Sequence, residues 1–259
     1  TGLIGKIIMK RSNWIFIFVG MQGVLYSAFL ALDITGTGIS LSNRIKFGVV
    51  ILCLCYTLLR RSEDAGKELF LLRSALFFTV ISDLIILFME DSFYFYGVLT
   101  FILVQQLYGM RLSLKDQPSD RTVGRNKLII LTLFKIGIQV AVSALVYLVL
   151  NYLGISLDRL IVVTVFYFVS LVTNTIYSIR IAILLRGVRS NLLFALGMIM
   201  FLLCDINVGL FNLSDFVSLP EHISGVIYTI SSILMWTFYA PSQVLIALSA
   251  DNFRQYRQK

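Results

Sequence analysis

Eight long apolar runs divide this chain, and short polar segments separate them. Most of the runs are long enough for a helix to cross roughly 30 Å of hydrocarbon at about 1.5 Å per residue. Of the 259 residues, 58% are hydrophobic and 14% are charged, well below the roughly 25% of charged residues in soluble domains. These features exclude a cytosolic enzyme, a disordered protein and a secreted disulfide scaffold. They indicate a polytopic membrane protein.

We therefore expect an all-α bundle of eight transmembrane helices, which forms a single integral-membrane domain over residues 1–259. The predicted spans are residues 14–32, 44–59, 69–89, 93–110, 128–149, 160–179, 192–211 and 223–248. The second span is predicted to be the weakest, because Lys46 shortens its apolar part. Basic residues precede the first span as in a signal peptide. Since it has no small-residue cleavage site and further spans follow, we expect an uncleaved helix.

Lysine and arginine gather in alternate connecting segments. If the N-terminus lies inside, 18 of the 22 fall in inner segments, 3 fall in outer segments, and Lys135 lies within a span. The positive-inside rule then predicts that both termini are cytoplasmic, and we expect the plasma membrane as the location. Basic loops beside an anionic leaflet explain the net charge of +8, so we expect no binding of nucleic acid.

Three ionisable side chains fall inside predicted spans: Asp83, Lys135 and Asp205. Each costs several kcal/mol at the bilayer centre unless it faces a polar interior or a partner. The two aspartates stand at similar depth on helices of the same direction. We expect them to share one cavity in the outer half of the membrane, with no hydrophobic layer between them. Two alternatives stay open: the aspartates are protonated or paired with Lys135, or Lys135 extends to the inner surface.

Polar residues at helical spacing form stripes along other predicted spans, so that each stripe shares one helix face. They include Gln105 and Tyr108, Lys135 and Gln139, Tyr167, Ser170 and Asn174, and Tyr239 and Gln243. Any single stripe is explained by hydrogen bonds that hold helices together. Several stripes together favour a wet or ligand-filled centre.

Several catalytic chemistries lack the residues that they need. The one histidine, His222, lies in a polar connection, which excludes an intramembrane Ser-His-Asp triad and a three-histidine zinc site. The sequence contains no P-loop, G-x-G-x-x-G or C-x-x-C motif. We therefore expect neither a cofactor nor a metal site, and carboxylates must supply any acid–base chemistry.

Two stretches resemble the lysoplasmalogenase (YhhN-like) family of eight-span membrane proteins. Residues 74–112 contain SALFFTVISDLIILF and then FYGVLTFILVQQLYGMRL, similar to the family's G/S-D-x-x-L helix and its helix ending F-x-x-A-H-x-x-Y. The second stretch contains LLFALGMIMFLLCDINVGLF and then WTFYAPSQVLIALS. It resembles the second S-D-x-x-L/I helix and the closing Y-x-x-A/S-Q-x-L-I segment.

The resemblance implies a hydrolase that cleaves the vinyl-ether bond of lysoplasmalogen-type lysolipids. It implies that Asp83 and Asp205 are the catalytic acids: one protonates the vinyl carbon, and the other stabilises the oxocarbenium ion. Gln105 is a departure, because the family usually has histidine at this position, and glutamine does not shuttle a proton as histidine does. The residues that we expect to bind substrate are Gln105, Tyr108, Lys135, Asn174, Tyr239 and Gln243.

A non-enzymatic interpretation uses the same residues. In a membrane transporter or sensor, Asp83 and Asp205 bind protons or a lipid-like or cationic ligand in the central polar cavity. A weak similarity between residues 74–111 and 192–248 is then a parallel repeat. In both interpretations the expected partners are a lysolipid or other amphiphilic small molecule and the membrane lipids. The sequence leaves the oligomeric state open.

Overall fold

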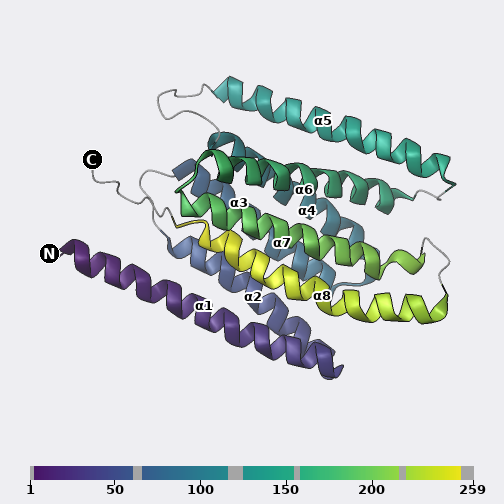
Figure 1. Cartoon of the computed structure of the whole chain (residues 1–259), viewed down its shortest axis with the longest axis horizontal. Coiled ribbons are helices and arrows are strands. Elements are labelled where there is room, and N and C mark those ends of the chain that lie inside the picture. The colour runs from purple at the N-terminus through teal and green to yellow at the C-terminus, as the bar shows by residue number, and fades with distance from the viewer. Residues whose placement is uncertain (1–2, 61–65, 116–124, 155–157, 216–219, 252–259) are drawn as a thin grey trace.

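The computed structural model describes residues 3–60, 66–115, 125–154, 158–215 and 220–251. Within them the chain forms eight α-helices and two short 3-10 helices, Asp91–Phe93 and Leu213–Asp215. The α-helices are α1 (Leu3–Thr35), α2 (Ile39–Leu59), α3 (Gly66–Phe88), α4 (Tyr94–Lys115), α5 (Arg125–Tyr152), α6 (Arg159–Leu184), α7 (Arg189–Phe211) and α8 (Glu221–Leu248). They lie side by side, and the start of α1 and the end of α8 lie toward the same end of the bundle (Figure 1). The predicted all-helical bundle of eight helices is confirmed.

Seven of these helices are long and apolar enough to cross a membrane, which makes the chain an integral multi-pass membrane protein. The exception is α4, and not α2 as the sequence suggested. Gln105, Gln106 and Arg111 interrupt the apolar run of α4. The helix packs against α3, α5 and α6, so these neighbours cover much of its surface. Its polar side chains can therefore meet protein groups, which lowers the cost of placing them at membrane depth.

Several helices extend beyond the predicted spans, and this changes the place of two basic residues. Lys46, at the start of the predicted second span, lies well inside α2, and Arg111, one residue beyond the predicted fourth span, lies inside α4. The Lys46 ammonium donates a hydrogen bond to Asp33 Oδ1 at 3.0 Å and lies 5.0 Å from the centre of the Trp236 ring. Because Asp33 neutralises this charge, α2 continues through Lys46 without a break.

Pro241 inside α8 has no backbone N–H, and so leaves the Thr237 carbonyl without its helical donor. The Tyr26 hydroxyl of α1 donates to this carbonyl at 3.4 Å. This contact satisfies a polar group that the apolar surroundings would otherwise penalise. It also links α1 to α8, which pack against each other.

Close approach of α7 and α8 depends on Gly197. A methyl group in place of its hydrogen would lie 2.7 Å from Ile246 Cγ1 and 3.1 Å from both Ile246 N and Ser242 O. Small residues at such crossings let helix backbones come together in membranes. This packing sets the spacing between the helix that carries Asp205 and the helix that carries Tyr239.

Candidate functional site

Both intramembrane aspartates accept a hydrogen bond from a tyrosine of another helix. The Tyr239 hydroxyl of α8 lies 2.9 Å from Asp83 Oδ1 and 2.7 Å from Oδ2, on α3. The Tyr167 hydroxyl of α6 donates to Asp205 Oδ2, on α7. Hydrogen bonds to carboxylates are stronger than those between neutral groups, so each phenol offsets part of the cost of burying its aspartate.

Two phenylalanine rings lie among these four side chains. The Phe101 ring of α4 lies 5.8 Å from the Tyr167 ring and 6.5 Å from the Tyr239 ring, between centroids. The Phe201 ring of α7 lies 5.5 Å from the Tyr239 ring and 5.8 Å from the Phe101 ring. An aromatic cluster therefore packs against both phenols, and the absence of a hydrophobic layer between the two carboxylates themselves stays a prediction.

The two carboxylates differ in their access to the surroundings of the bundle. Asp83 is 4% exposed, whereas Asp205 is half-buried. The two phenols are buried to a similar degree, so the difference lies with the aspartates themselves. Asp205 therefore has more contact with the surroundings of the bundle than Asp83, which is enclosed.

Three of the six predicted substrate-binding residues lie level with these pairs or about one helical turn from them. Tyr239 contacts Asp83 directly, and Gln243 follows it by one turn of α8. Gln105 follows Phe101 by one turn of α4. The Asn174 amide of α6 donates to the Gln105 backbone oxygen at 2.7 Å and to its side-chain oxygen at 3.1 Å.

Tyr108 is fully buried, and its ring meets the Phe194 ring edge-on at 5.3 Å. It stands one turn further along α4 than Gln105, in the direction of the end of the bundle that holds the end of α8. Its surroundings are mainly apolar core, so the structure gives Tyr108 a packing role whatever else it does.

Lys135 lies apart from the aspartates. Its ammonium donates to Ser113 Oγ at 2.8 Å and lies 3.6 Å from the centre of the Tyr177 ring. Ser113 is twelve residues beyond Phe101 on α4, about 18 Å along the helix axis. The position agrees with the alternative in which Lys135 extends toward the inner surface, and it does not bring Lys135 to the aspartates.

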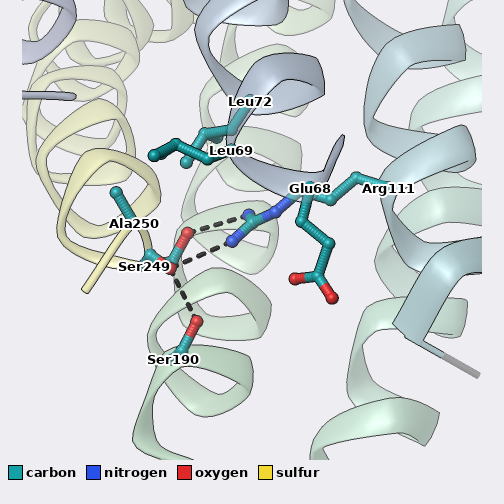
Figure 2. Close-up of a pocket in the computed structure, with 7 residues that line it drawn as sticks. All are labelled: Glu68, Leu69, Leu72, Arg111, Ser190, Ser249 and Ala250. Atoms are coloured by element: carbon teal, nitrogen blue, oxygen red, sulfur yellow. Dashed lines mark hydrogen bonds between the residues drawn. The ribbon is translucent and has the colours of Figure 1, made fainter. Parts of the chain in front are cut away.

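A small cavity of ≈ 20 Å³, about the space of one water molecule, lies near the end of α8. Glu68, Leu69, Leu72, Arg111, Ser190, Ser249 and Ala250 line it (Figure 2). Arg111 donates to Ser249 Oγ at 2.9 Å and to Ser249 O at 3.0 Å, so it holds the C-terminal end of α8. None of the residues that we predicted for the site lines this cavity.

The sequence reasoning missed Tyr167 and both phenylalanines of the aromatic cluster, Phe101 and Phe201. Tyr167 was recognised only as part of a polar stripe, and Phe101 was not considered at all. The signal for Tyr167 was available, because its stripe faces the interior beside the helix that carries Asp205. Phe101 offered no such signal, since a phenylalanine in an apolar helix is indistinguishable from a core residue. Among the described residues, no group of three or more His, Cys, Asp or Glu side chains is placed to hold a metal ion.

The fold and the site together define a multi-pass membrane protein with carboxylate–phenol pairs inside its helix bundle. The chain belongs to the YhhN family, whose model matches residues 45–250. The match runs from within α2 to just beyond α8, and α1 lies outside it. No curated protein and no solved structure matched the chain.

Proposed function

We propose that this YhhN-family protein is an intramembrane hydrolase that cleaves the vinyl-ether bond of lysoplasmalogen-type lysolipids. The observation that supports this best is the pair of carboxylate–phenol contacts, Asp83 with Tyr239 and Asp205 with Tyr167, around Phe101. Vinyl-ether hydrolysis needs a proton donor, a group that stabilises a cation, and water. These side chains supply the first two, and the reaction requires no redox cofactor.

In the proposed mechanism Asp205 is the acid, because it is the more exposed of the two carboxyl groups. Its proton adds to the vinyl carbon that carries no oxygen, and the double-bond electrons form the new C–H bond. The other vinyl carbon and the ether oxygen then share a positive charge. The Asp83 carboxylate and the faces of the aromatic rings stabilise that charge.

Water completes the reaction by attacking the oxygen-bearing carbon and losing a proton to the Asp205 carboxylate, which restores the acid. The resulting hemiacetal breaks its bond to the glycerol oxygen, with transfer of the hydroxyl proton to that oxygen. The products are a fatty aldehyde and a glycerophospho-compound, so the net reaction consumes one water. Tyr167 and Tyr239 orient the two carboxylates throughout.

Aldehyde release from a lysoplasmalogen, with purified protein in detergent, tests the proposal. We expect activity from the wild type and none from Asp83→Asn or Asp205→Asn, because an amide neither donates a proton to carbon nor carries negative charge. Glu90→Gln is the matched control, since this carboxylate is exposed at the end of α3. Tyr239→Phe should reduce the rate, whereas Tyr228→Phe on an exposed part of the same helix should not.

One observation favours the second candidate, a transporter or sensor for a cationic amphiphile. Asp83 accepts a hydrogen bond from Tyr239, whose ring packs against Phe101 and Phe201, and a carboxylate beside aromatic rings is an arrangement that binds ammonium groups. Suppose that the wild type releases no aldehyde but binds lysophosphatidylcholine, and that Asp83→Asn loses this binding. The transporter or sensor function would then replace the hydrolase proposal. Aldehyde release that survives in both aspartate variants would reject the proposed mechanism.

A further inference from the structure

Helices α4 and α8 run in the same direction at a fixed register. Phe101 meets Tyr239 through their rings, and Arg111 bonds to Ser249. Both pairs are separated by the same 138 residues of sequence. Gln105 and Gln243 have this separation too, so they stand level with each other, between the two contacts.

The two glutamines also point the same way as the rings above them. Each follows its aromatic neighbour by four residues, which places it on the same helix face about 6 Å further along the axis. Since the Phe101 and Tyr239 rings contact each other, we expect Gln105 and Gln243 to extend toward one region of the core from two sides. We call these two residues the glutamine layer.

The glutamine layer holds hydrogen-bonding groups that the protein leaves unused. Both glutamines are fully buried. Neither Nε2 nor Oε1 of Gln243 has a hydrogen-bond partner among the described residues, and the same holds for Nε2 of Gln105. A buried polar group without a partner costs about 1–3 kcal/mol, so several in one layer are retained only at a considerable cost in stability.

The chemistry of the layer fits a hydroxyl group. The unpaired atoms are amide donors and one amide acceptor, all of them neutral, and a hydroxyl both accepts and donates. Gln106, the neighbour of Gln105 in sequence, shows the contrast, because its amide is bonded to Gln139 Oε1 at 3.1 Å. Within the described residues, Nε2 of Gln105 and both amide atoms of Gln243 have no such partner.

Accepting the proposed function, we infer that the glutamine layer binds the free hydroxyl of the substrate's glycerol and thereby selects lysolipids over their acylated forms. A lysoplasmalogen carries this hydroxyl on the carbon beside the one that bears the vinyl ether. The spacing agrees, since the layer lies about one helical turn, or ~6 Å, from the ring of Tyr239, which binds Asp83. A site built to bond a hydroxyl rejects an analogue that lacks it, because its own polar groups then stay unpaired.

Binding of two uncleavable probes tests this inference. One is a 1-O-alkyl lysophosphatidylcholine, whose saturated ether replaces the vinyl ether, and the other is its 2-O-methyl derivative. We expect the full-length wild type in lipid nanodiscs to bind the hydroxyl probe about tenfold more tightly, the effect of roughly 1.4 kcal/mol. Gln243→Met should bring the ratio of the two dissociation constants close to one, and Gln105→Met should lower it. Gln106→Met, a matched change that lies outside the layer, should leave the ratio unchanged.

A wild-type ratio near one, or a ratio that Gln243→Met leaves intact, overturns the inference. If Gln243→Met does not fold, Gln243→Asn decides, because it keeps an amide but withdraws it by one carbon and should also lower the ratio. The probes contain no vinyl ether, so the result is separate from the hydrolase assay. If the protein releases no aldehyde but keeps the tenfold ratio, the hydrolase proposal fails while the hydroxyl-binding site stands.

Discussion

Replacing Gly197 with alanine should destabilise the bundle and misplace the site at the same time. The added methyl carbon would lie 2.7 Å from Ile246 Cγ1 and 3.1 Å from two backbone atoms of α8, Ile246 N and Ser242 O. A side-chain carbon can rotate away, but backbone atoms yield only if α8 itself moves. The helices must therefore separate by several tenths of an ångström.

The expected cost follows from comparison with two other glycines. At Gly97 the close atoms belong to the side chains of Ile86 and Ile85, which can shift, so Gly97→Ala should cost about 1 kcal/mol. Gly197→Ala should cost about 2–3 kcal/mol, the upper part of the range for an overpacked core, because backbone must move. Gly209, also on α7, has no atom within 4 Å, and Gly209→Ala should leave stability unchanged or raise it slightly.

Thermal unfolding in detergent, followed by circular dichroism and aldehyde release, measures both effects. We expect Gly209→Ala to have the highest unfolding temperature of the three variants, Gly97→Ala an intermediate one and Gly197→Ala the lowest. Folded Gly197→Ala should also lose activity, because α8 carries Tyr239 and Gln243. A Gly197→Ala protein as stable and as active as Gly209→Ala would refute the claim that this contact sets the spacing of the two helices.

Three further predictions concern charge, orientation and metals. Lys46→Met should lower the free energy of unfolding by about 3 kcal/mol, the lower end for breaking a buried ion pair, because the Asp33 side chain keeps 15% exposure. Chemical unfolding should show that adding Asp33→Asn recovers most of this loss, since it removes the unpaired charge. In intact cells a membrane-impermeant maleimide should label a cysteine at Thr37 and spare one at Arg186, and the reverse result contradicts the positive-inside assignment. Treatment with a chelator should leave aldehyde release unchanged, whereas a loss that added Zn²⁺ or Mg²⁺ restores would show a metal-dependent reaction.

The sequence predicted the number of helices because hydrocarbon thickness demands a long apolar run for every helix exposed to lipid. It failed where protein replaces lipid as the neighbour. α4 carries Gln105 and Arg111 because other helices cover it, and α2 tolerates Lys46 because Asp33 lies beside it. Neither partner is adjacent in sequence, so composition alone could not identify the groups that stabilise these two charges.

The candidate site was predictable to the extent that polar residues in apolar helices stand out. Asp83, Asp205 and Tyr239 were identified in this way, and each carboxylate accepts a hydrogen bond from a tyrosine of another helix. Their partners were not predictable, because which helix faces which depends on packing between distant segments. Phe101 shows this limit most clearly, since only the assembled bundle reveals that an ordinary apolar residue contacts both phenols.

The link between α4 and α8 has a mechanical consequence. The pair is joined near the aspartates by the Phe101 and Tyr239 rings, and again about 15 Å away by the bonds of Arg111 to Ser249. Two attachment points at that separation resist both sliding and hinge-like opening between the two helices. We therefore expect any widening of the bundle that admits a lipid tail to move α4 and α8 together, while the surrounding helices shift relative to this pair.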